Sequence, residues 1–96
     1  MDAAVLQEEI DAVSVMLYQN REQEALENIG VLLGKLKEVT DALLCINDDM
    51  KQQIESIITR MYQILYDAYS HKDMLGMADC LQEYASLALE LYKVKC

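Results

Sequence analysis

The sequence predicts an all-α protein, an antiparallel up-and-down bundle of four helices that forms a single domain over residues 1–96. Three observations lead to this prediction. The chain contains no proline and only three glycines, so few residues would interrupt a helix. Apolar residues recur at spacings of three and four along nearly the whole chain, which is the pattern of helices with one apolar face. The breaks in this pattern are short, and short connections favour antiparallel neighbours.

The first two helices are expected over residues 3–18 and 21–45, the first being the shortest of the four. Asn20 and Gln23 fit a loose capping box at the start of the second helix. The apolar stripe of the first helix consists of Leu6, Ile10, Val13 and Leu17. The stripe of the second consists of Leu26, Ile29, Leu33, Leu36, Thr40 and Leu43.

Two glycines, Gly30 and Gly34, lie within the second helix. Each is less favourable than alanine there by about 1 kcal/mol. We therefore expect them to allow a neighbouring helix to approach closely.

The last two helices are expected over residues 49–69 and 73–94, after polar breaks at residues 46–49 and 70–73. The stripe of the third helix consists of Met50, Ile54, Ile57, Met61, Ile64 and Ala68. The stripe of the fourth consists of Met74, Met77, Leu81, Tyr84, Ala88 and Leu91. A competing fold would make residues 47–95 one long helix of a coiled-coil dimer. The break at 70–73 and the breadth of the apolar faces, which suits two neighbours rather than one, argue against it.

Charge and composition exclude several classes of function. The net charge is −9, and no basic face is visible that could neutralise phosphates, so we expect neither nucleic-acid binding nor attraction to an anionic membrane. No apolar run approaches the roughly 18 residues needed to span a bilayer. The N-terminus carries acids where a secretory signal carries bases. The lack of a secretory pattern favours a cytoplasmic protein with reduced thiols, as do the three widely spaced cysteines, Cys45, Cys80 and Cys96.

The residues needed for catalysis are largely missing. The single histidine, His71, falls in a predicted turn, and the cysteines do not form the tight pairs of a zinc site. His71 is nine residues from Cys80, too far along a helix for direct contact. No Gly-rich phosphate loop and no nucleophile motif are present. We therefore expect no enzyme, no metal and no cofactor.

Three tyrosines of the third helix form the main candidate surface. Tyr62, Tyr66 and Tyr69 follow one another at i, i+4 and i+7, rotated away from the apolar stripe. Tyrosine offers a large contact area with a polar tip and is frequent at protein interfaces. Two interpretations remain open: a partner binds this ridge, or the second or fourth helix covers it.

Several stretches also resemble a known family. They are Arg21–Leu26 with Ile29 and Leu33, Asp41–Leu43, Leu65–Ala68 and Lys72–Asp73. In order and spacing they resemble the flagellar export chaperone family (FliS-like). The last helix is also similar to small uncharacterised bundle proteins of Gram-positive bacteria. One motif departs from the family at two positions, because Met16-Leu17-Tyr18 is followed by Gln-Asn rather than Asp-Gly.

The resemblance implies a cytoplasmic bundle that binds the C-terminal tail of flagellin and keeps it unpolymerised before export. Together with the tyrosine ridge it leads to our first hypothesis, a non-catalytic chaperone or adaptor that holds a helical segment of a partner protein. The partner contacts would be Tyr62, Tyr66 and Tyr69, together with a displaceable first helix carrying Leu6, Ile10, Val13 and Leu17. The alternative is a structural homodimer that has no other ligand.

Overall fold

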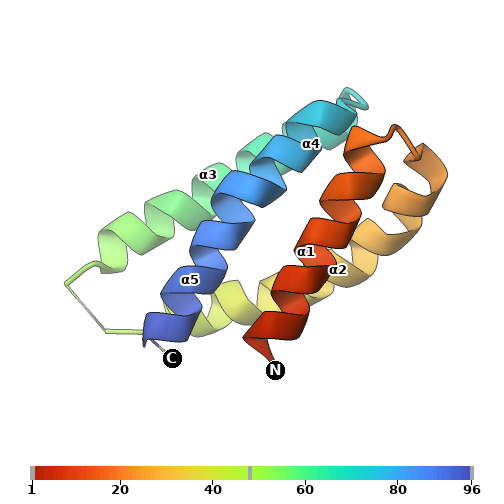
Figure 1. Ribbon diagram of the computed structural model, residues 1–96. Coiled ribbons are helices and arrows are strands. Elements are labelled where there is room, and N and C mark those ends of the chain that lie inside the picture. The colour runs from red at the N-terminus through yellow and green to blue at the C-terminus, as the bar shows by residue number, and fades with distance from the viewer. Residues whose placement is uncertain (1, 48, 96) are drawn as a thin grey trace.

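The computed structural model describes residues 2–47 and 49–95, and within them the chain forms four helices (Figure 1). Asp48, part of the first predicted break, and Cys96, one of the predicted thiols, lie outside the described residues, as does Met1. The first three helices are α1 (Ala3–Tyr18), α2 (Glu22–Leu44) and α3 (Lys51–Ser70). The fourth is continuous and consists of α4 (Met74–Cys80), a π-helical segment η1 (Leu81–Ala85) and α5 (Ser86–Lys95). The all-α class is confirmed, and the helix bounds agree with those predicted to within two residues.

The same turn ends α1 and α3. Asn20 and Lys72 adopt left-handed backbone conformations, with φ of 57° and 54°. The next residue then donates its N–H five residues back, from Arg21 to Met16 at 2.9 Å and from Asp73 to Ala68 at 2.8 Å. This is the Schellman arrangement, which satisfies carbonyls that a helix end leaves free.

These turns correct one expectation, the capping role of Asn20, and rule out the competing fold. Asn20 ends α1 instead of capping α2, because its left-handed backbone closes the turn; the residue before α2 is Arg21, which makes no side-chain capping bond. The left-handed Lys72 likewise stops α3, so residues 47–95 do not form the single long helix of the competing fold.

Asp73 and Gly76 together position the start of α4. The Asp73 carboxylate accepts a hydrogen bond from the Gly76 N–H at 2.9 Å, which caps the helix. A Cβ on Gly76 would collide with that carboxylate and lie 3.3 Å from the Cβ of Ala68 on α3. Glycine therefore permits both the cap and the close approach of α4 to α3.

The helices share one aliphatic core. α1 packs against α2 and α4, while α3 packs mainly against α4, and α5 packs against α2. By contrast, α2 and α3 contact each other far less than α1 contacts α2 or α3 contacts α4. The seam between α2 and α3 is therefore the least closely packed of the seams between neighbouring helices. α1 begins and α5 ends at the same end of the molecule (Figure 1).

The buried faces of α2 and α3 are rotated slightly from the predicted stripes. On α2 the core takes Ala25, Leu32 and Val39, whereas Leu26 and Leu33 are only half-buried. On α3 the core takes Ile58 and Leu65, the half-buried residues are Ile57 and Ile64, and Met50 is exposed. The physical reason is that apolar residues stand in adjacent pairs, so the spacing alone does not say which member faces the core.

A row of hydrogen bonds joins α1 to the last helix, and we call it the polar seam. Gln82 donates to Ser14 at 2.9 Å and to Asp11 at 3.1 Å. Gln7 donates to Ser86 at 3.2 Å, and at the far end Tyr18 donates to Asp79 at 2.7 Å. Ser14 is buried, and its hydroxyl donates a hydrogen bond to the carbonyl of Ile10. Within the described residues, no buried side-chain polar atom lacks a partner.

Candidate functional site

A groove with a volume of about 850 Å³ runs between α2 and α3. It exists because the core takes one member of each apolar pair and leaves the other at the seam, as with Leu32 and Leu33 or Leu43 and Leu44. The residues that line it from α2 are Leu33, Gly34, Lys37, Thr40, Asp41 and Leu44. Those from α3 are Ile58, Thr59, Tyr62, Gln63 and Tyr66. Apolar surface that stays exposed to water is unfavourable and often marks a binding site, so this groove is a candidate binding site.

Gly34 leaves the backbone of α2 bare on the wall of this groove. A Cβ built at Gly34, or at Gly30 one turn earlier, meets no heavy atom within 4 Å. Neither residue has a positive φ. The expectation that these glycines allow a neighbouring helix to approach closely is therefore wrong for the described part of the chain, where no other helix lies against them.

Tyr62 crosses the groove and bonds α3 to α2. The Thr40 hydroxyl donates a hydrogen bond to the carbonyl of Lys37 at 3.1 Å. The Tyr62 hydroxyl, 3.0 Å from the Thr40 oxygen, must then be the donor in that pair. Burial has the largest effect on the pKa of Tyr62 and raises it. The hydrogen bond to Thr40 and the charge of Lys37 lower this pKa in part, while Tyr66 and Asp41 add to the increase. Tyr62 thus stays neutral at physiological pH and holds the two walls together.

The rim of the groove on α2 carries one ion pair. Lys37 and Asp41 approach to 2.9 Å, one helical turn apart. The hydrogen bond to Asp41, and then the charge of its carboxylate, raise the pKa of Lys37. Both side chains are exposed, so the pair contributes little to stability.

The three predicted tyrosines occupy different environments. Tyr62 is half-buried against α2, and its ring stacks on that of Tyr66 with centroids 6.1 Å apart. Tyr66 is 57% exposed and lines the groove beside it. Tyr69 is 52% exposed and is not among the lining residues. The structure therefore brings two of the three together at the groove, and α2 covers one of them in part.

The first helix does not offer partner contacts in this structure. Its four stripe residues are at most 4% exposed, because α2, α4 and the π-helical segment enclose them. They are core residues while α1 is docked, so they would contact a partner only if α1 were displaced, and their role as partner contacts stays a prediction. The residues in question are Leu6, Ile10, Val13 and Leu17.

The sequence reasoning missed the α2 wall of the groove. The apolar stripe of the second helix predicts Leu33 in the core, and nothing in the pattern connects Gly34, Thr40 or Leu44 with a binding surface. One signal in the sequence indicates this wall. The second helix has pairs of adjacent leucines, and a single stripe facing the core has room for only one leucine of each pair.

The thiol of Cys80 is buried and unsuited to catalysis. Its Sγ donates a weak hydrogen bond to the Met61 carbonyl at 3.3 Å. Burial, with a smaller contribution from Glu83, raises its pKa to about 11. The nucleophilic thiolate is therefore scarce at neutral pH. Cys45 is exposed, and in residues 2–47 and 49–95 no three His, Cys, Asp or Glu side chains gather as they would around a metal ion.

We expect Cys80 to react with a thiol reagent only when the protein unfolds. In a C45S/C96S variant, labelling at neutral pH should be at least about 100-fold slower in the native protein than in urea. The free energy of unfolding should also fall as pH rises from 9.0 towards about 11, since the unfolded thiol ionises first. A C45S/C80S/C96S variant is the control and should lose less stability over this range, because only Tyr62 and other groups with raised pKa values still contribute to the loss. Fast native labelling would contradict the burial of this thiol.

The comparisons with known proteins assign no relatives. The chain matches no protein-family model, and no curated protein and no solved structure is significantly similar to it. In the part of the chain that the structure describes, no helix has the length and apolar character required to cross a bilayer.

Proposed function

We propose that this chain is a non-catalytic binding protein, an antiparallel up-and-down bundle that holds a helical segment of a partner in the groove between α2 and α3. One observation carries the proposal: the chain's own helices leave this apolar seam open. From Leu33 to Leu44 the groove wall extends about 17 Å, enough for about three turns of a bound helix. Such a helix would bury its apolar face against Leu33, Leu44 and the Tyr66 ring.

The flagellar resemblance supplies the first partner to test, but the proposal does not depend on it. A chaperone of that kind would work in the cytoplasm and shield a helical tail of flagellin until export. No family match supports this assignment, so the groove itself, rather than the resemblance, is the basis of the proposed function.

Tyr66→Ala tests the groove directly. Because the ring lines the groove while remaining exposed, its loss should weaken binding of an amphipathic helical peptide, with a flagellin tail as the first one tried, at least about tenfold. It should change the free energy of unfolding by less than about 1 kcal/mol. Tyr69→Ala is the matched control, since Tyr69 is similarly exposed on the same helix but lies outside the groove lining. Isothermal titration and urea unfolding measure the two effects.

Two results would count against this interpretation. A large fall in melting temperature for Tyr66→Ala would show that Tyr66 supports the fold. Equal losses of binding for Tyr66→Ala and Tyr69→Ala would show that binding does not use the groove.

A second surface favours the homodimer as another candidate function. On the last helix an apolar stripe is partly open to solvent, with Leu87 42% and Val94 78% exposed. Its members, at spacings of three, four and three, are Tyr84, Leu87, Leu91 and Val94. A dimer through this stripe would have a mass near twice 11.0 kDa and a stability that rises with protein concentration. A monomer whose stability is independent of concentration would rule it out.

A further inference from the structure

The charges around the groove indicate which kind of helix fits it. We infer that the occupant is a basic amphipathic helix from another protein, and not a second copy of this chain. The inference rests on the proposed function and names the class of partner for that same groove.

An acidic hollow lies near the start of α2, on the same side of the helix as the groove, because Leu26 of the hollow and Leu33 of the groove are seven residues, or about two turns, apart. This hollow of about 520 Å³ at the start of α2 is lined by Glu22, Gln23, Leu26 and Glu27, so it carries two carboxylates and no base. Neither carboxylate takes part in an ion pair with a described residue. A helix that extends beyond the groove in this direction would place its polar side chains against negative charge.

The basic residues near the groove do not neutralise these carboxylates. Lys37 is the cation among the lining residues, and Asp41 already neutralises it. On the α3 side a smaller hollow next to the groove, of about 440 Å³, contains both Arg60 and Glu55. The charged residues that line the groove therefore cancel, and the two carboxylates of the hollow give this side of α2 a net negative charge.

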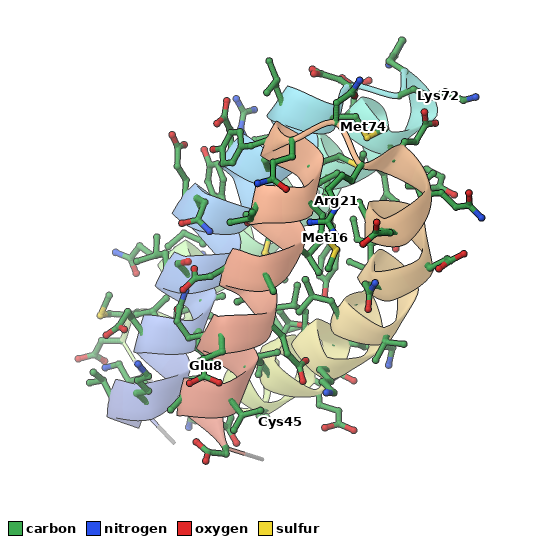
Figure 2. The ribbon with its side chains drawn as sticks, turned by 45° about the vertical axis from the view of Figure 1, so that its right-hand side comes forward. Glu8, Met16, Arg21, Cys45, Lys72 and Met74 are labelled. Carbon is green, nitrogen blue, oxygen red and sulfur yellow. The ribbon has the colours of Figure 1, made fainter. Side chains whose placement is uncertain are left out.

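The rest of the surface adds to this charge. The chain has 17 acidic and 8 basic residues. The outer face of α1 contributes carboxylates such as Glu8, which projects away from the neighbouring helices in Figure 2. An approaching basic segment is attracted, whereas a second copy with charge −9 is repelled. Apolar burial in the groove then supplies most of the affinity, and the charges supply selectivity and association rate.

Two synthetic helices of about 18 residues, or five turns, separate these contributions. Both carry the same leucine stripe; one has lysine and the other glutamate at the polar positions. We expect the lysine peptide to bind the full chain at least about tenfold more tightly at low salt, with an advantage that shrinks as salt is raised. Fluorescence anisotropy of labelled peptides gives both dissociation constants.

Gly34→Leu locates the binding site. Its side chain would fill the groove from the α2 wall and should weaken binding of the lysine peptide at least about tenfold. The matched control is Ala4→Leu, which adds a similar side chain at an exposed position on α1 and should leave binding unchanged. Both positions are exposed, so both variants should fold.

Each alternative result of these experiments would contradict a different part of the proposal. If neither peptide binds, the proposed function fails. If both bind equally and Gly34→Leu weakens both, the groove holds helices but the basic class is wrong. If the lysine peptide is indifferent to Gly34→Leu, the attraction is a general property of the acidic surface. If sedimentation shows a dimer that Gly34→Leu dissociates, the occupant is a second copy.

Discussion

Ile10→Ala is expected to lower the free energy of unfolding by about 3 kcal/mol, the largest effect of any single change considered for α1. Ile10 is fully buried at the middle of the helix. Truncating it removes apolar contacts and leaves a cavity that the surrounding helices cannot fill. Urea unfolding followed by circular dichroism measures the loss.

The matched control is Val15→Ala on the same helix. Val15 is 48% exposed, so its truncation should change the free energy of unfolding by less than about 1 kcal/mol. A loss below about 1 kcal/mol for Ile10→Ala would instead show that α1 is loosely docked.

The same magnitudes bear on the displaceable first helix. Burying one large aliphatic side chain contributes about 1.5–3 kcal/mol. The four buried residues of the α1 stripe together approach the whole stability of a small domain, about 5–15 kcal/mol. A partner that displaced α1 would have to replace all of that burial. The groove between α2 and α3 demands no such exchange, which is why we place the partner there.

Gly30→Ala and Gly34→Ala are together expected to raise the free energy of unfolding by about 2 kcal/mol. Each removes the cost of glycine inside a helix, about 1 kcal/mol, and each added methyl group enters open space. The single variants should contribute about equally, since neither Cβ meets a heavy atom within 4 Å.

Gly76→Ala supplies a control of opposite sign. Its Cβ would collide with the Asp73 carboxylate that caps α4, so this change should destabilise the protein. If Gly34→Ala also destabilised it, a neighbour would have to lie against Gly34 in solution. A second copy bound there, absent at high dilution, would produce that result.

The sequence predicts the fold class and the helix bounds well because they depend on local signals. Proline is absent, glycine is rare, and polar residues mark the turns around Asn20 and Lys72. The side-chain chemistry of those turns was less predictable. Asn20 can either cap a helix or adopt a left-handed backbone, and the choice depends on how α1 meets α2.

The groove could not be predicted from spacing because it depends on packing between distant helices. Leu32 and Leu33 are equivalent in the pattern, yet one faces the core and the other the groove. Tyr66 was identified as a candidate contact from its position beside the stripe, and the structure places it on the groove wall. The π-helical segment at Leu81–Ala85 had no recognisable signal in the sequence.

The polar seam has a consequence for how precisely α1 is aligned. A leucine-rich stripe repeats at nearly every turn, so sliding α1 by one turn, about 5.4 Å, would still pair apolar side chains with apolar side chains. Hydrogen bonds do not tolerate that shift. A slipped α1 would break the Tyr18–Asp79 bond and deprive the buried Ser14 oxygen of its donor on Gln82, although Ser14 would keep its own bond to the Ile10 carbonyl. The seam thus selects a single axial register from several that hydrophobic burial alone would permit.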